Sequence, residues 1–247
     1  MLDPQLRRLD LELVARGLAR SRAHAQAMIG AGGVRVDGVV ARRPATRVDA
    51  ASVLEASPDH YVSRGAHKLA GALDDLGLTV PNRALDAGAS TGGFTQVLLE
   101  RGCRQVIAVD VGTDQLAERL RDDPRVRWLP QTNLRDLTLA HVDQMPVDLV
   151  VADVSFISLT LVVGPLVGVT AADGQLLLLV KPQFEVGRER LSPSGVVTDE
   201  RLRRQAVDSV VASAEVHGWT EAAVVPSRIA GATGNLELFV LLRRRGR

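Results

Sequence analysis

The sequence predicts an α/β fold in which a mostly parallel, seven-stranded sheet follows a small α+β module. Three observations predict it. Short apolar segments alternate with helical ones beyond residue 64, a glycine-rich turn follows the first of these segments, and residues 1–56 show two short helices and then a hairpin. Alternating strands and helices are typical of a parallel sheet covered on both faces. The 247 residues are enough for one large domain and one small module.

The small module is expected to span residues 1–56. Leu6, Leu9, Leu13 and Val14 recur at helical spacing, and a second helix is expected over 22–31, where it ends at a Gly-Gly pair. The segment 34–40 alternates apolar and other residues around an Asp-Gly turn. That pattern is a strong signal of a β-hairpin.

A polar linker, 57–63, separates this module from the larger domain, 64–247. Proline in the linker discourages a continuing helix. The expected strands of the larger domain lie near 83–87, 105–109, 126–129, 147–152, 175–181, 219–226 and 236–242. Because only a loop separates the last two, we expect them to pair antiparallel at one edge of the sheet.

The glycine-rich turn is the clearest candidate ligand site. Residues 85–95 read LDAGASTGGFT, in which the glycines let the backbone approach a ligand and the following helix begins with unpaired N–H groups. No Lys-Ser/Thr pair follows the last glycine, which argues against a phosphate-binding P-loop. The next apolar strand ends in Asp110, an acid suited to a ribose diol. The pattern favours S-adenosylmethionine over NAD, and a turn that binds no ligand remains the alternative.

Positive charge is concentrated in the N-terminal module. Residues 1–56 hold nine Arg against six acidic residues, whereas the whole chain has a net charge of +1. Arginine suits phosphate because its planar fork bonds two oxygens at once. The module is therefore predicted to contact nucleic acid, and a solvated basic face is the alternative.

Composition excludes several other classes. No apolar run approaches the roughly 18 residues of a membrane span, and the polar first ten residues do not resemble a signal peptide. A single cysteine, Cys103, permits neither an intrachain disulfide nor a Cys/His metal cluster. We expect a cytoplasmic protein with no metal and no membrane partner.

Charged residues follow two core strands, where an α/β sheet offers its active site. Asp153 follows the run 147–152, and Lys181 follows the next apolar strand. Either residue by itself can mark the return of the chain to solvent, but two successive strands ending in Asp and Lys favour chemistry. Lys68 and Glu237 are weak candidates when each is considered by itself.

The N-terminal module closely resembles the S4 RNA-binding domain. The matching segments include Arg8-Leu9-Asp10, Ser21-Arg22, Gly32 to Val36 and Asp37-Gly38. By implication, structured RNA is the partner, and the resemblance of the whole chain given below makes it ribosomal RNA or a ribosomal subunit. The resemblance places RNA, recognised through phosphate and shape, across Arg7, Arg20, Arg22, Gln26, Arg35, Arg42 and Arg43.

The larger domain resembles the FtsJ-like ribose 2′-O-methyltransferases. Lys68, Asp153, Lys181 and Glu237 match the Lys-Asp-Lys-Glu tetrad of that family in order and context. The whole chain is similar to the TlyA family of rRNA cytidine 2′-O-methyltransferases, which are also called haemolysin-like. The resemblance implies a Rossmann-like class I methyltransferase fold. Longer members continue as a helix where this chain stops, and they are implied to modify both subunits, so large-subunit 23S RNA is favoured and small-subunit 16S RNA is a further candidate.

The resemblance also implies roles for individual residues. Lys181 is expected to act as base or alkoxide stabiliser, promoted by Lys68, with Asp153 and Glu237 holding the lysines and the hydroxyl in place. The residues expected to hold the cofactor are Asp86, Gly88, Ser90, Gly92 and Phe94 at its methionine part, Asp110 at its ribose, Asn133 at its adenine and Asp153 at its sulfonium.

Two aromatic residues follow Asp153 and Lys181 in the sequence. Phe156 and Phe184 are candidates to stack a flipped base. A ribosome-assembly factor that binds RNA without catalysis is the alternative function, and the retained glycine turn and tetrad argue against it. Direct haemolysis is not favoured, because no amphipathic basic helix or barrel pattern is evident.

Overall fold

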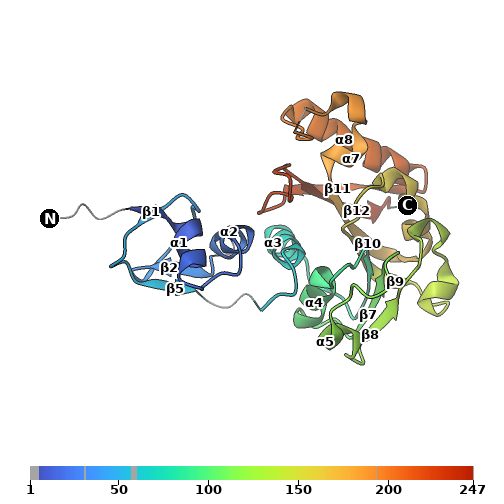
Figure 1. Cartoon of the computed structure of the whole chain (residues 1–247). Coiled ribbons are helices and arrows are strands. Elements are labelled where there is room, and N and C mark those ends of the chain that lie inside the picture. Colours follow the sequence, from blue (N-terminus) through green and yellow to red (C-terminus); the bar gives the residue numbers. More distant parts are fainter. Residues whose placement is uncertain (1–5, 31, 57–59, 193, 247) are drawn as a thin grey trace.

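A small N-terminal module lies beside a larger domain built on one seven-stranded sheet (Figure 1). The computed structural model describes residues 6–30, 32–56, 60–192 and 194–246. The predicted α/β class is confirmed. The start of the predicted linker, 57–59, and the last residue of the predicted second helix, Ala31, lie outside the described residues.

Two helices and two small antiparallel sheets form the N-terminal module. Its elements are β1 (Arg7–Arg8), α1 (Leu9–Ala15), α2 (Arg22–Gly30), β2 (Val34–Val36), β3 (Val39–Val40), β4 (Arg47–Val48) and β5 (Leu54–Ala56). Strand β1 pairs with β4, and β2 lies between β3 and β5. Leu9, Leu13, Ala25 and Ile29 are fully buried in the core of the module. The helical spacing in the sequence therefore identified the packed positions Leu9 and Leu13, whereas Leu6 and Val14 of the same set are exposed.

The larger domain is organised by a sheet with strand order β11-β12-β10-β9-β6-β7-β8. Its strands are β6 (Arg83–Ala87), β7 (Gln105–Val109), β8 (Val126–Leu129), β9 (Val147–Ala152), β10 (Thr170–Val180), β11 (Trp219–Pro226) and β12 (Leu238–Arg244). Strands β6 to β10 run parallel to one another, whereas β12 pairs antiparallel with both β10 and β11. The expected antiparallel pair is therefore present, with β11 at the edge.

Helices cover both faces of this sheet (Figure 1). They are α3 (Gly65–Leu76), α4 (Gly93–Glu100), α5 (Glu118–Arg121), α6 (Val163–Gly168), α7 (Pro182–Glu185) and α8 (Glu200–Glu215), with short 3₁₀ turns at Leu134–Asp136, Leu139–Val142, Leu159–Leu161 and Arg188–Arg190. Leu69 of α3 and Leu98 of α4 pack in one hydrophobic cluster. Leu166 of α6 and Val207 of α8 pack in a second cluster. The sheet lies between these two cores.

The sequence placed most elements correctly and missed a few of their ends. Strand β10 begins at Thr170, five residues before its expected start. The sequence did not predict these first five residues as strand because they include Asp173 and Gly174 and lack an apolar pattern. Strand β12 covers 238–244 rather than 236–242. Strands β4 and β5 have only two and three residues and therefore leave no readable period in the sequence.

The two parts of the chain meet where α2 approaches α3 and the segment that follows β11 (Figure 1). A side chain at Gly30 would place its Cβ 3.3 Å from Ile229 Cγ2, so the end of α2 lies close to that segment. No helix among the described residues is long and apolar enough to cross a membrane. In the same residues, no three His, Cys, Asp or Glu side chains come together as metal ligands would.

Candidate active site

Two buried ion pairs lie at the carboxyl edge of the central sheet. Lys68 Nζ is 2.6 Å from Glu237 Oε2, and Lys181 Nζ is 2.6 Å from Asp153 Oδ1. The four side chains are between 3% and 20% exposed. Because a buried charge is costly without a partner, the pairing explains how two lysines occupy one buried site.

The sheet itself brings the four residues together. Asp153 and Lys181 directly follow β9 and β10, which are parallel neighbours, so both emerge at the same edge. Glu237 directly precedes β12, whose Leu238 pairs with Val180 of β10, which puts Glu237 opposite Lys181. Lys68 reaches the same place from the buried face of α3. Glu237 is thus placed by an antiparallel register of β12 on β10 that the sequence did not reveal, and Lys68 by the packing of α3.

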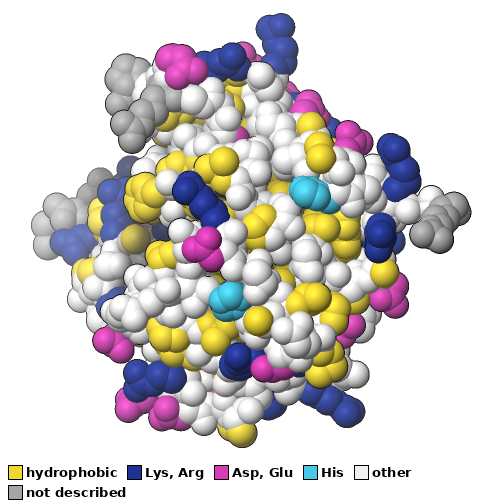
Figure 2. All heavy atoms as spheres, turned by 90° about the vertical axis from the view of Figure 1, so that its right-hand side faces the viewer, with side chains coloured by type: hydrophobic (Ala, Val, Ile, Leu, Met, Phe, Trp, Pro, Cys, Tyr) yellow, Lys and Arg dark blue, Asp and Glu magenta, His cyan; other side chains and the backbone are white. Residues whose placement is uncertain are grey.

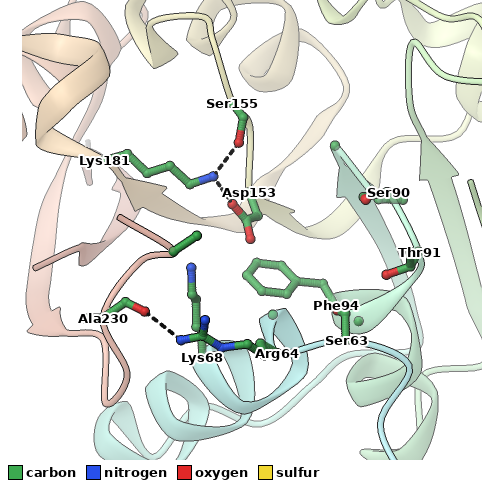
Figure 3. Close-up of a pocket in the computed structure, with 15 residues that line it drawn as sticks. Ser63, Arg64, Lys68, Ser90, Thr91, Phe94, Asp153, Ser155, Lys181 and Ala230 are labelled. Carbon is green, nitrogen blue, oxygen red and sulfur yellow. Dashed lines mark hydrogen bonds and ion pairs between the residues drawn. The ribbon is translucent and has the colours of Figure 1, made fainter. Parts of the chain in front are cut away.

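Cavities lie on both sides of the two lysines. One, of about 250 Å³, is lined by Lys68, Asp153, Lys181 and the glycine turn from Gly88 to Thr91 (Figure 3). The other, of about 580 Å³, is lined by the same two lysines together with Glu237 and two aromatic rings. The lysines therefore stand between the glycine turn and a second, larger space.

A third cavity extends the glycine-turn side of the site. It measures about 390 Å³ and is lined by Gly88, Ser90, Asp110, Asn133 and Asp153, among others. Asp110 Oδ2 accepts a hydrogen bond from Ser90 N at 2.8 Å and Oδ1 accepts one from Gly112 N at 2.8 Å, so each oxygen keeps a free lone pair. Asn133 caps the turn at 134–136 by accepting from Arg135 N. These donors and acceptors suit a nucleoside with a ribose diol.

The glycine turn needs its glycines for space as well as for conformation. Gly88 has φ +82°, and a Cβ there would lie 2.8 Å from the carbonyl oxygen of Asp153. Gly92 has φ +96°, and a Cβ there would overlap Leu116 and Leu120. Any side chain at Gly88 would close the approach to Asp153, so the close backbone packing expected of a ligand cradle is present.

Asp86 and Gly92 lie behind the cavities rather than in their walls. Asp86 has no exposed surface and accepts a hydrogen bond from Thr95 Oγ1 at 2.6 Å, whereas its Oδ1 has no hydrogen-bond partner among the described residues. Burial raises the pKa of Asp86 to about 7. Phe94 lines the 250 Å³ cavity and packs on Phe239 at a ring-centroid distance of 6.0 Å. The other predicted cofactor residues line the cavities directly.

Ser155 and Glu185 are site residues that sequence reasoning missed. Ser155 Oγ accepts a second hydrogen bond from Lys181 Nζ at 2.8 Å. Glu185 accepts hydrogen bonds from Ser158 Oγ and from Leu159 N, the latter at 2.9 Å, and its burial raises its pKa. These contacts tie the segment after β9 to the segment after β10. A serine two residues beyond Asp153 was the available signal for the first of them.

Of the predicted RNA-contacting residues, all but Gln26 are exposed. The exposed ones are Arg7, Arg20, Arg22, Arg35, Arg42 and Arg43. Arg22 and Gln26 both donate to Asp10 at 2.9 Å.

The face farthest from this module shows acidic and basic side chains dispersed among apolar ones (Figure 2). No single basic block is visible on that face.

Comparison with known proteins identifies both parts of the chain. Residues 61–244 match the model of the FtsJ-like methyltransferases, and residues 7–54 match that of the S4 domain. The chain belongs to the FtsJ-like methyltransferase family. It is 52% identical over 240 residues to the 16S/23S rRNA (cytidine-2′-O)-methyltransferase TlyA of Mycobacterium tuberculosis, covering 96% of this chain and 89% of that one. It is 35% identical over 182 residues to the 23S rRNA (cytidine-2′-O)-methyltransferase TlyA of Campylobacter jejuni, covering 72% and 69% of the two chains.

Solved structures share the fold of this chain. A candidate hemolysin from Streptococcus thermophilus superposes with a TM-score of 0.73 at 36% identity, covering 98% of this chain and 89% of that one. An S-adenosylmethionine-dependent methyltransferase from Mesorhizobium loti superposes with a TM-score of 0.52 at 15% identity, covering 70% and 96%, and shares the fold. The predicted resemblance is confirmed, and S-adenosylmethionine is the cofactor of this FtsJ-like domain.

Proposed function

We propose that this protein transfers a methyl group from S-adenosylmethionine to the ribose 2′-oxygen of a cytidine in ribosomal RNA, with 23S RNA as the favoured target. The observation that carries the proposal is the placement of two lysine–carboxylate pairs between the glycine-turn cavities and the 580 Å³ cavity. Such a site holds a cofactor on one side and a nucleotide on the other, with polar groups at the meeting point.

The residues on the glycine-turn side fit the cofactor. Asp110 has free lone pairs for the ribose hydroxyls, Asn133 lines the same cavity for the adenine, and the turn at Gly88 to Ser90 gives close backbone approach for the methionine part. Asp153, which lines both of these cavities, would place a carboxylate beside the sulfonium. When bound, S-adenosylmethionine supplies a methyl group that its positive sulfur already makes electrophilic.

Lys181 acts on the substrate hydroxyl. A ribose 2′-hydroxyl is a poor nucleophile, so it must lose its proton as the new bond to carbon forms. Lys181 Nζ is placed to accept that proton, and the carboxylate of Asp153, 2.6 Å away, would stabilise the ammonium that results. Ser155 fixes the amine from a second direction at 2.8 Å. The Lys68–Glu237 pair borders the same space and orients the hydroxyl.

Positioning is expected to contribute more than proton transfer. Alignment of reacting groups supplies about 7–11 kcal/mol. General-base assistance supplies 10²–10⁴-fold, or about 3–5 kcal/mol. The rigid origin of all four tetrad side chains, from three strand ends and one packed helix, suits a site in which alignment dominates.

The 580 Å³ cavity is proposed to receive the target nucleotide. Phe156 is 92% exposed at its rim and has φ +64°, which is an uncommon backbone conformation for an aromatic residue. Its ring centroid lies 5.5 Å from that of Phe184. An exposed aromatic face beside the lysines suits stacking of a base turned out of its helix.

The choice of 23S RNA rests on the relatives. The names of the mycobacterial and the Campylobacter relatives both include 23S rRNA, whereas 16S rRNA is included only in the name of the mycobacterial one of these two. The S4 domain supplies the RNA-binding module, and its exposed arginines supply contacts to phosphate.

Transfer of labelled methyl groups to purified rRNA tests the proposal. The full-length protein is incubated with methyl-labelled S-adenosylmethionine and unmodified 23S or 16S RNA, and the modified nucleoside is identified after digestion. We expect 2′-O-methylcytidine from 23S RNA. Label on a base, on another nucleoside, or on no RNA at all would contradict the proposal. Lys181→Ala is the inactive control.

A further inference from the structure

We infer that Asp10 is a positioning residue for RNA recognition, because it holds Arg8, Arg22 and Gln26 in one array on the N-terminal module. The inference rests on the proposed function, since it assigns that module the contact with RNA. It adds two residues, Arg8 and Asp10, that sequence reasoning did not place among the RNA-contacting set.

Asp10 is a buried carboxylate whose bonding capacity is taken up by cationic and amide donors. Its side chain has no exposed surface. Arg8 donates to it from Nε at 2.9 Å and from Nη2 at 3.0 Å, and Arg22 Nε and Gln26 Nε2 each donate at 2.9 Å. Arg8 holds the pKa of Asp10 far below its usual range, so the group stays ionised at any working pH. Arg8 comes from β1, which precedes α1, and Arg22 and Gln26 come from α2, which follows it.

The arginines retain donors that point away from Asp10. Arg22 binds Asp10 through Nε only, so both of its terminal nitrogens make no hydrogen bond to the described residues. Arg8 likewise keeps Nη1. Their side chains are 55% and 35% exposed. One carboxylate therefore brings two guanidinium groups together at reduced repulsion and leaves their outer edges available for phosphate oxygens.

Fixing these side chains before binding removes an entropic cost. A long side chain that is already held in place loses little freedom when it contacts a phosphate. Replacing Asp10 would free Arg8 and Arg22 and would leave Gln26 without its acceptor. RNA affinity should then fall although every cationic residue is still present.

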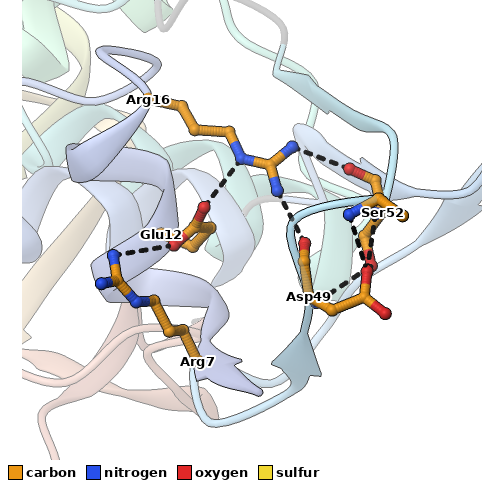
Figure 4. Close-up of polar contacts among 6 residues, drawn as sticks. Arg7, Glu12, Arg16, Asp49 and Ser52 are labelled. Carbon is orange, nitrogen blue, oxygen red and sulfur yellow. Dashed lines mark hydrogen bonds and ion pairs between the residues drawn. The ribbon is translucent and has the colours of Figure 1, made fainter. Parts of the chain in front are cut away.

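Glu12 provides a matched contrast on the same helix. It is also buried and paired with an arginine, Arg16. Arg16 donates its terminal nitrogens to the carbonyl oxygens of Asp49 and Ser52, each at 2.7 Å, so its donors are used within the module (Figure 4). Arg7 forms only a longer ion pair with Glu12, at 3.6 Å and without a hydrogen bond. Glu12 thus holds by hydrogen bonds only Arg16, whose donors are used within the module.

Five full-length variants test the inference. Three are the single variants Asp10→Asn, Glu12→Gln and Arg22→Lys. The fourth is the double variant Arg22→Ala/Gln26→Ala, and the fifth adds Asp10→Asn to that double variant. The probe is unmodified 23S RNA, and the readouts are RNA affinity, KM for RNA, kcat and cofactor affinity. We expect Asp10→Asn to weaken RNA binding and raise KM by about 10-fold with unchanged kcat and cofactor affinity. Glu12→Gln should change KM by less than about 2-fold.

Coupling separates positioning from general stability. In the Arg22→Ala/Gln26→Ala background, Asp10→Asn should cost less than half of its effect in the wild-type protein, because two of its three partners are gone. Full additivity, or an equal loss in Glu12→Gln, would overturn the inference. If Asp10→Asn does not fold, the Arg22→Lys variant tests the inference instead. This variant keeps the positive charge but loses the hydrogen bond from Nε to Asp10, so RNA binding should weaken about 5-fold. Wild-type affinity in that variant would overturn the inference.

The outcome is distinguishable from failure of the proposed function. Wild-type protein that binds 23S RNA without methylating it would contradict the proposed function and leave the Asp10 array to be decided by the affinities. Normal methyl transfer with unchanged affinity in Asp10→Asn would overturn the array and leave the proposed function standing. Wild-type protein that binds no rRNA would overturn both.

Discussion

Replacing Lys181 separates chemistry from binding at this site. Lys181→Ala removes the ion pair to Asp153 and the hydrogen bond to Ser155. Loss of general-base assistance lowers the rate of methyl transfer by 10²–10⁴-fold, or about 3–5 kcal/mol of transition-state stabilisation. Because Asp153 keeps a side chain that is 20% exposed, water can reach it, and the loss of folding stability should stay at about 1–3 kcal/mol.

The assay is single-turnover methylation at saturating RNA and cofactor across a pH range. Saturation removes binding from the measured rate, so kcat-type effects are read directly. RNA and cofactor affinities of Lys181→Ala should match those of the wild-type protein. Thermal unfolding checks that the variant is folded at the assay temperature.

Lys181→Arg distinguishes a base from a fixed positive charge. A guanidinium stays protonated and cannot accept the proton of the hydroxyl. The arginine variant should therefore be about as slow as the alanine variant at every pH. If Lys181→Arg keeps the wild-type rate, the reasoning is refuted and Lys181 acts only through its charge.

Three further predictions follow from single side chains. Asp110→Ala should weaken S-adenosylmethionine binding by about 1.5–3 kcal/mol with RNA affinity unchanged, and calorimetry with unaltered cofactor affinity would remove Asp110 from the site. The pKa of Asp86 is raised to about 7 from a usual 3.8, so the folded state binds this proton more tightly than the unfolded state does. The contribution of Asp86 to the unfolding free energy therefore decreases by up to about 1.4 kcal/mol per pH unit as the pH rises from 3.8 to about 7, and it is constant above that range. Urea unfolding at several pH values should show that Asp86→Asn loses this decline; an unchanged profile would mean that Asp86 does not titrate there. Phe156→Ala should slow methyl transfer by about 10-fold with unchanged folding stability, because the ring is exposed, and an undiminished rate would exclude stacking on it.

The carboxyl ends of strands were readable from the sequence because their signal is local. Asp110, Asp153 and Lys181 each follow an apolar run, and the rule that parallel strands end at one edge puts them together. Glu237 required the antiparallel register of β12 on β10, which depends on pairing between distant segments. Its role came from the family resemblance.

The side-chain contacts of Asp10 and Glu12 could not be predicted from the sequence. Nothing in the local pattern distinguishes Asp10, which gathers Arg8 and Arg22, from Glu12, which serves a structural arginine. Both acids lie in the first turn of α1, where either favours the helix start. The difference arises from which arginines the fold brings near each carboxylate. The arrangement in three dimensions is needed to tell an RNA-facing cluster from a structural one.

The central claim is tested most directly by locating the methyl group that the protein adds. Full-length protein, S-adenosylmethionine and unmodified 23S RNA are combined, and the product is mapped by resistance of the 2′-O-methylated linkage to alkaline cleavage together with mass analysis of the nucleoside. The account predicts one methyl group on the 2′-oxygen of a cytidine, absent with Lys181→Ala. A methyl group on a base, or equal transfer by the alanine variant, would contradict it.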